Sequence, residues 1–236
     1  MNPVLGKVRT IYKCELVSGM SGKRGRCAKF LATHNLYEHF NNTLQEGYTP
    51  HVTGKVDGEC YYIHDKQLLK RRDLKSGRDT PENWFETCPT DNKGHRIGFM
   101  KLADNASDDK WALSTLTYKN GITFVRTLTI DKGSVDIVDL PIEQLEGRTV
   151  ELVGPKIQGN KHMLNVHCIV PHGLFQLTGF PKNFCFDEFV KWFETDNKTR
   201  FFEGVVVHFN NGELYKIHRH HLNMEWLPCK LEYIPL

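Results

Sequence analysis

The 236-residue sequence lacks a paired set of cysteines: their number is odd, and no two of them form a Cys-x-x-Cys pair. This pattern fits neither a disulfide framework nor a zinc site of four cysteines. Reduced thiols are typical of the cytoplasm and the nucleus, so we expect an intracellular protein. The cysteines predicted to be reduced are Cys14, Cys27, Cys60, Cys88, Cys168, Cys185 and Cys229.

Long apolar runs are missing as well. No stretch reaches the roughly 18 consecutive apolar residues that a membrane-spanning helix needs, and the first residues lack the apolar core of a signal peptide. We therefore expect no contact with a membrane. Repeats, low-complexity tracts and a clear linker are also absent, which predicts one domain over residues 1–236, with residues 1–47 as its N-terminal part and no separate C-terminal domain. We expect a monomer.

A strong charge of either sign is the third absence. The chain carries 31 Lys and Arg against 28 Asp and Glu, a net charge of +3. So small an excess neither requires nor excludes an RNA partner. Charged residues make up 25% and hydrophobic residues 39% of the chain, which is typical of a folded globular domain and excludes a disordered one.

Short β-forming segments separated by turn-rich pieces make up most of the chain. Strands are predicted over residues 97–102, 111–118, 122–130 and 149–153. The pair Asn211-Gly212, between residues 201–209 and 213–220, predicts a hairpin. One clear amphipathic helix is predicted over residues 186–193. The fold class is therefore α+β, with mainly antiparallel sheets.

Residues 51–63 contain a lysine with an aspartate two positions later, between β-forming runs. We interpret them as a strand, a tight turn that carries Lys55, and a second strand, with Gly54 and Gly58 allowing close backbone approach. A lysine is a covalent nucleophile only if its surroundings lower its pKa, so that part of its amine is neutral. Taken alone, the pattern around Lys55 and Asp57 is more often an ordinary solvated turn.

Two other polar features are ambiguous from their pattern. Glu151 lies inside a β-branched run, so its side chain faces either solvent or a polar cleft. The cations Lys70, Arg71 and Arg72 either lie near Lys55, where they would favour its neutral amine, or form a solvated strand edge.

Four segments stand in a characteristic order along the chain. They are Lys55-Val56-Asp57-Gly58, Glu151-Leu152-Val153-Gly154, Glu203-Gly204-Val205-Val206 and Leu214-Tyr215-Lys216-Ile217-His218. This order resembles the covalent nucleotidyltransferase superfamily of ATP-dependent ligases and capping enzymes. Residues 169–173 with Phe175-Gln176, and residues 216–222, make the sequence more similar to the 5′-to-3′ RNA ligase family typified by vertebrate RNA ligase one. The resemblance spans the chain from about residue 48 to its end and implies a ligase-type adenylyltransferase domain.

The resemblance also implies a reaction. Lys55 would attack the α-phosphorus of ATP to form lysyl-AMP, AMP would pass to an RNA 5′-phosphate, and a 3′-hydroxyl would displace it in RNA repair. The partners would be ATP, with Mg²⁺ or Mn²⁺, and RNA with 5′-phosphate and 3′-hydroxyl ends. Lys216 would neutralise phosphate charge, and Asp57 would orient the acceptor end or the metal.

By the same resemblance, Arg71 would bind ribose or phosphate, Phe175 would stack on adenine, and Glu203 and Glu151 would contact the metal. The catalytic set is then Lys55, Asp57 and Lys216. The nucleotide-binding set is Thr53, Gly54, Lys55, Arg71, Glu151, Phe175, Glu203, Lys216 and His218.

The sequence departs from the family pattern at two positions. His218 stands where the superfamily usually has a second lysine, and Gly54 replaces a glutamate of the vertebrate proteins. A zinc site in the histidine-rich segment is less favoured, because only His218 and His220 would share a strand face and no cysteine has matching spacing. The alternatives are a DNA ligase, a capping-type guanylyltransferase and a non-catalytic RNA-binding module.

Overall fold

The computed structural model describes residues 5–18, 29–104 and 106–235, which divide into two compact units. Unit 1 comprises the described residues of Met1–Lys7, Val56–Leu174 and Pro228–Leu236, and unit 2 those of Val8–Lys55 and Phe175–Leu227. Among the described residues, no helix has the length and apolar character needed to cross a membrane. Six of the cysteines are free thiols, as predicted, and Cys27 lies outside the described residues.

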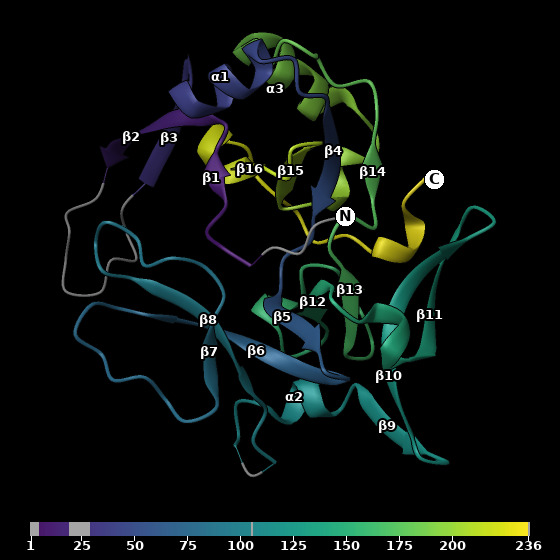
Figure 1. The fold of residues 1–236 in the computed structure, drawn as a ribbon. Helices are drawn as coiled ribbons and strands as arrows, with labels where there is room; N and C mark the ends of the chain where they lie inside the picture. The colour runs from purple at the N-terminus through teal and green to yellow at the C-terminus, as the bar shows by residue number, and fades with distance from the viewer. Residues whose placement is uncertain (1–4, 19–28, 105, 236) are drawn as a thin grey trace. The chain divides into compact units, whose positions relative to one another are not determined.

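Unit 2 contains a five-stranded sheet and a two-stranded sheet (Figure 1). The five-stranded sheet has the order β1 (Arg9–Thr10), β16 (Leu214–His218), β15 (Gly204–Phe209), β4 (Pro50–Lys55) and β14 (Gln176–Leu177). The smaller sheet pairs β2 (Tyr12–Ser18) with β3 (Lys29–Leu36). The helical elements are α1 (Glu38–Gln45), α3 (Phe186–Thr195), η3 (Thr199–Phe201) and η4 (Arg219–Leu222).

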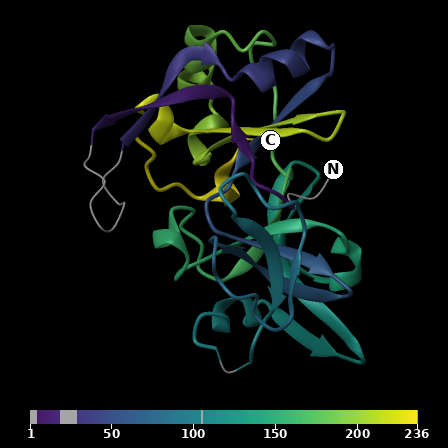
Figure 2. The same cartoon turned by 60° about the vertical axis from the view of Figure 1, so that its left-hand side comes forward.

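One face of the five-stranded sheet packs on the helices. Val205, Val207 and Phe209 alternate along β15 and are buried, as the period of two predicts. Phe40 of α1 places its ring 4.9 Å from that of Tyr215 and 5.5 Å from that of Phe209. Figures 1 and 2 show α1 and α3 next to each other in this layer. The intervening positions of β4, β15 and β16 project from the opposite face.

Unit 1 contains a nine-stranded sheet. Its order is β11 (Ser134–Pro141), β10 (Ile122–Asp131), β13 (Cys168–Pro171), β12 (Thr149–Val153), β5 (Glu59–His64), β6 (Gln67–Leu74), β8 (Arg96–Lys101) and β7 (Trp84–Glu86), and β9 (Leu116–Lys119) pairs with β10. The helical elements are α2 (Lys110–Leu113), η1 (Ile142–Leu145), η2 (Gln158–Asn160) and η5 (Leu231–Tyr233). Of all strand pairs in the described residues, only β1 with β16 and β10 with β13 are parallel. The predicted α+β class with mainly antiparallel sheets is confirmed.

The core of unit 1 lies on one face of this sheet. Val150 and Leu152 of β12 and Tyr61 of β5 belong to one cluster of buried apolar side chains, together with residues of η1 and α2. Glu151 lies between Val150 and Leu152, so its side chain projects from the other face. The residue Glu151 is nevertheless only 7% exposed. Of the two environments that the sequence allowed, a solvent face and a polar cleft, the structure therefore supports the buried, polar one.

Three local predictions were wrong. β4 and β5 do not form a hairpin, because β4 pairs with β15 and β14 while β5 pairs with β12 and β6. Lys55 is therefore the last residue of a strand, and not part of a turn. Residues 111–118 contain the end of α2 and most of β9, not one strand. The predicted strand over 213–220 ends at His218, where η4 begins.

Candidate functional site

Lys55 is fixed at the end of β4 by a neighbour on each side of the strand. Its partner in β15 is Gly204, and the Lys55 carbonyl accepts a 3.0 Å hydrogen bond from the backbone N–H of Glu203. On the other side, the backbone N–H of Gly54 donates to the Phe175 carbonyl at 2.9 Å. The backbone around the candidate nucleophile is thus held by two segments that are distant in sequence from β4.

Sheet register brings the predicted residues of unit 2 into two rows. Lys55 pairs with Gly204, which pairs with His218 on β16. In the next row, two positions away, Thr53 pairs with Val206, which pairs with Lys216. Directly paired residues project from the same face, so Lys55, His218, Thr53 and Lys216 share the face that is not covered by α1 and α3.

The carboxylate of Glu203 binds two partners from these rows. Its Oε2 accepts a hydrogen bond from Lys55 Nζ at 2.5 Å, and its Oε1 lies 2.7 Å from Nδ1 of His218. The side chains of Lys55 and Glu203 are 22% and 20% exposed. At this depth a charge-assisted hydrogen bond is stronger than at the surface. Glu203 therefore occupies the centre of the site, and one oxygen serves each partner.

The charge states of this group follow from burial and from the neighbouring charges. Burial alone would raise the pKa of Glu203, but the hydrogen bond from His218 and the charge of Lys55 lower it to about 2. Burial lowers the pKa of His218, and the cations Lys55 and Lys216 act in the same direction, whereas Glu203 opposes them. At neutral pH, Glu203 is ionised and His218 is neutral. In the segment from Leu214 to His218, the cationic side chain is then Lys216 and not His218.

Thr53 and Gly54 contact residues that the sequence did not single out. Thr53 is 1% exposed, and its hydroxyl lies 2.9 Å from Nε2 of His208. Gly54 faces the other way, and a Cβ at this position would collide with the ring of Phe202. A side chain at position 54 therefore requires that Phe202 move. Val206 of β15 pairs with Thr53, and His208 lies two positions further along β15, on the same face. This alternation was the sequence signal that could have placed His208 near Thr53.

Phe175 lies in the interior of unit 2. Its ring is 2% exposed and lies 5.2 Å from the ring of Phe202. The next residue, Gln176, is exposed and pairs with Thr53, so its side chain shares the face of Lys55. Stacking of Phe175 on adenine stays a prediction. Gln176 is an additional polar candidate on the Lys55 face.

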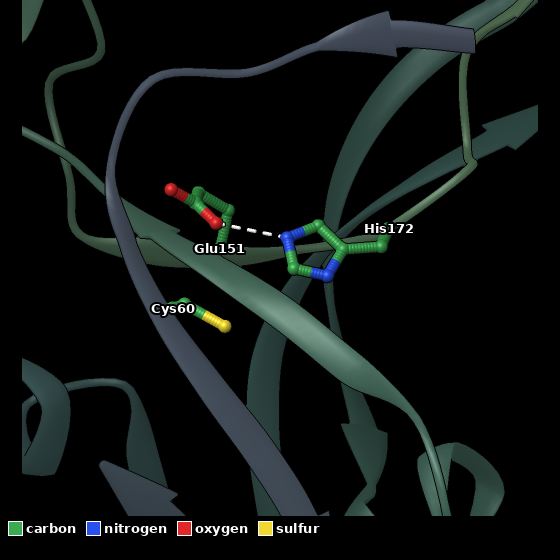
Figure 3. Close-up of side chains that lie close together, drawn as sticks. All are labelled: Cys60, Glu151 and His172. Atoms are coloured by element: carbon green, nitrogen blue, oxygen red, sulfur yellow. Dashed lines mark hydrogen bonds and ion pairs between the residues drawn. The ribbon is translucent and has the colours of Figure 1, made fainter. Parts of the chain in front are cut away.

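Glu151 belongs to a second polar group, in unit 1 (Figure 3). Its Oε1 accepts a 3.1 Å hydrogen bond from the backbone N–H of Gly58, and its Oε2 lies 2.8 Å from Nε2 of His172. The other ring nitrogen of His172 lies 2.9 Å from the hydroxyl of Thr149. A Cβ at Gly58 would collide with the carbonyl of Leu152. The glycine of the Lys55 motif is thus needed for its close approach to β12.

Asp57 and Arg71 also belong to unit 1. The backbone N–H of Asp57 donates to Nε2 of His162 at 3.0 Å. Arg71 binds both carboxylate oxygens of Asp73, at 2.9 and 3.4 Å, and the carbonyl of Gly6 at 3.2 Å. Burial would lower the pKa of Arg71, but its contact with Asp73 raises it. The guanidinium is charged and already bound within its own unit.

The structure therefore joins some predicted residues directly within unit 2, whereas others belong to unit 1. Lys55, Glu203 and His218 are in contact, and Lys216 and Thr53 project from the same sheet. Glu151, Asp57 and Arg71 lie in unit 1, where Lys70 also pairs with Asp109 at 3.2 Å. His172 belongs to the stretch 169–173 that carries the family resemblance, whereas His208 and Phe202 are residues that the sequence did not single out.

Comparison with known proteins assigns the chain to a family. The sequence model of the family described as RNA ligase 1 matches residues 82–234. RNA ligase 1 of Danio rerio is 32% identical, over 96% of this chain and 83% of that protein. The proteins of the same name from Rattus norvegicus and Mus musculus are each 28% identical over the same shares. Since the family model matches more than half of the chain and the Danio rerio relative is aligned with nearly all of it, the chain belongs to the RNA ligase 1 family.

Proposed function

We propose that the protein is an ATP-dependent RNA ligase that joins a 5′-phosphate to a 3′-hydroxyl through lysyl-AMP at Lys55, and that it acts in RNA repair. Family membership supports RNA as the substrate. The observation that carries the lysine chemistry is the contact of Lys55 with Glu203 on one sheet face, beside His218 and Lys216. An ordinary solvated turn would not hold a lysine 2.5 Å from a carboxylate whose own partner is a buried histidine.

In the first step, the Lys55 amine attacks the α-phosphorus of ATP. The N–P bond forms, the bond from the α-phosphorus to the bridging oxygen breaks, and pyrophosphate leaves. The amine must first lose a proton to solvent and move away from Glu203, to which it now donates. Lys216 projects from the same face, where it would stabilise the charge that develops on the α-phosphate.

The donor atoms present fit a hard divalent cation. Glu203 is ionised at neutral pH, because its pKa is lowered to about 2, and carboxylate oxygens are the ligands that Mg²⁺ and Mn²⁺ prefer. Glu203 in unit 2 and Glu151 in unit 1 would each contact a metal ion. Bound Mg²⁺ or Mn²⁺ would neutralise phosphate charge. Glu203 is also the acceptor of the Lys55 hydrogen bond, so one carboxylate would serve both the metal and the nucleophile.

The remaining residues would hold the nucleotide and the RNA. Thr53 and Gly54 precede Lys55 on β4, and His218 lies in its row on β16 beyond Gly204. These three residues would line the nucleotide, and Phe175 would stack on its base. In the second step, an oxygen of the RNA 5′-phosphate attacks the phosphorus of lysyl-AMP, and the lysine amine leaves. In the third, the 3′-hydroxyl attacks the 5′-phosphorus and AMP leaves. Asp57 and Arg71 would orient the RNA end or the ribose.

The decisive experiment is to incubate the purified protein with ATP and magnesium and to map any AMP adduct by mass spectrometry. We expect one AMP on Lys55, and none in Lys55→Ala or Lys55→Arg. Lys66→Ala is the matched control, because Lys66 is an exposed lysine paired with Glu143 and should leave the adduct unchanged. An adduct that persists in Lys55→Ala, or RNA sealing by that variant, would refute the proposal.

The alternatives are separated by the nucleotide and the acceptor. Labelling from GTP rather than ATP would indicate a capping-type guanylyltransferase. Sealing of nicked DNA but not of RNA would indicate a DNA ligase. RNA binding without any adduct would indicate a non-catalytic module.

A further inference from the structure

Three different donor atoms meet on one face of the nine-stranded sheet, around Glu151. Cys60 of β5 is the direct partner of Glu151 on β12, so their side chains share a face, and His172 directly follows β13. The Cys60 sulfur, a Glu151 oxygen and a His172 nitrogen all lie within 4.8 Å of one another. Figure 3 shows the imidazole and the carboxylate facing each other with the thiol beside them.

The orientation of two of these donors is fixed by contacts outside the group. Gly58 N–H binds Oε1 of Glu151 and leaves Oε2 towards His172. The Thr149 hydroxyl binds Nδ1 of His172 and leaves Nε2 towards Glu151. A histidine that ligates a metal usually binds such a partner through its other ring nitrogen, which fixes the tautomer and the ring plane. The supporting contacts of a metal site are therefore already in place.

We propose that Cys60, Glu151 and His172 bind a divalent ion of borderline softness, with Zn²⁺ or Co²⁺ as the test ions. Sulfur and imidazole nitrogen favour such ions, whereas Mg²⁺ requires oxygen. In a tetrahedral site the nitrogen and oxygen ligands are about 3.3 Å apart, so the present 2.8 Å between Nε2 and Oε2 must open slightly. The fourth position is left to water, and the thiol proton passes to solvent as the metal–sulfur bond forms.

Solvent can reach this group. The side chain of His172 is 24% exposed and that of Glu151 is 10% exposed, and Cys60 is half-buried. The site differs from the cluster of Glu203, His218 and His220 in unit 2, which also has three possible ligands but offers no sulfur. A metal–thiolate signal therefore distinguishes the two clusters.

A consequence follows if Glu151 binds the nucleotide, and this step rests on the proposed function. An ion held by Cys60 and His172 would use the oxygen that the nucleotide needs. Zinc and ATP would then compete, and zinc would inhibit adenylylation in the wild type more than in Cys60→Ser. Binding of the ion itself does not depend on this step.

The test is a titration of the full chain with Co²⁺ alone, followed by absorption spectroscopy. We expect a thiolate-to-cobalt charge-transfer band that saturates at one ion per chain and is displaced by Zn²⁺. The band should be lost in Cys60→Ser. In His172→Gln and Glu151→Gln, the apparent affinity for Co²⁺ should fall at least tenfold. Cys88→Ser, which removes another half-buried thiol of unit 1, and His218→Gln should both retain it.

A second measurement uses only the wild-type protein, so it tests the site even if a variant does not fold. Zn²⁺ should slow alkylation of Cys60 by iodoacetamide at least tenfold, as mapped by mass spectrometry, and should not slow alkylation of Cys88. Absence of the band, a band that Cys60→Ser retains, or equal alkylation of Cys60 with and without zinc would overturn the site. A band that ATP does not diminish would uphold the site and contradict the nucleotide role of Glu151.

Discussion

Replacement of Glu203 by glutamine should change how the stability of the protein depends on pH. The carboxyl has a pKa of about 2 in the folded chain, against a usual value of 4.5. A carboxyl whose pKa is lowered by folding stabilises the protein above its unfolded pKa, and this contribution is lost as the pH falls towards the folded value. Glutamine keeps the shape of the side chain but cannot ionise, so the variant lacks this contribution at every pH.

The size of the effect follows from the shift. A difference of about 2.5 pKa units corresponds to roughly 3 kcal/mol of stability at neutral pH. Because the Glu203 side chain is 20% exposed, solvent screening removes only a small part of it. By linkage, about 2 kcal/mol of the wild-type advantage should disappear between pH 5 and pH 3.

The assay is urea unfolding of the wild type and of Glu203→Gln at pH 5, 4 and 3, followed by circular dichroism. The difference between their free energies of unfolding should shrink by about 2 kcal/mol over this range. Glu143→Gln is the matched control, since Glu143 is an exposed carboxylate paired with Lys66. A difference that stays constant to within about 0.5 kcal/mol would refute the claim that Lys55 and His218 hold Glu203 ionised.

Three other predictions concern the same sheet. Gly54→Ala should destabilise the protein by about 1–3 kcal/mol in urea unfolding because its Cβ would collide with the ring of Phe202, and a Phe202→Leu background that does not relieve the loss would contradict this cause. Lys216→Ala should lower the rate of lysyl-AMP formation by a factor of about 10²–10³ and shift its pH–rate profile to higher pH. An unchanged rate and profile would exclude a role of Lys216 in stabilising phosphate charge. Thr53→Val should cost about 1–3 kcal/mol in thermal unfolding because it leaves the buried His208 without its hydroxyl partner; a loss below about 0.5 kcal/mol would show that this contact is dispensable.

Periodicity and turn residues predicted the parts of the fold that depend on local order. β12 has the bounds Thr149–Val153 that its β-branched run predicts, and α3 contains the predicted helix over residues 186–193. The hairpin around Asn211-Gly212 is present as β15 and β16. These elements are set by neighbours in the sequence: alternation for the strand, four-residue spacing for the helix and a left-handed glycine, Gly212, for the hairpin.

Strand pairing between distant segments could not be predicted in the same way. Two β-forming runs separated by Val56-Asp57-Gly58 are typical of a hairpin, yet β4 and β5 enter different sheets because β4 pairs with a strand far away in the sequence. The β4 strand pairs with β15, about 150 residues later, and β5 pairs with β12. Similarly, Trp111 is helical because residues 110–113 close a turn whose cap carbonyl belongs to Asp109.

The polar groups show the same limit at the level of side chains. Resemblance to a family selected Lys55, Glu203 and His218, but it carried no information on their contacts with one another. In the structure, Glu203 holds Lys55 as a hydrogen-bonded cation, which is the opposite of the neutral amine that attack requires. Under the proposed function, this hydrogen bond must break before Lys55 attacks. Glu203→Gln therefore separates two roles: if the carboxylate only binds metal, the variant loses adenylylation at every pH, whereas if it also restrains Lys55, the residual rate of the variant should depend less steeply on pH than that of the wild type.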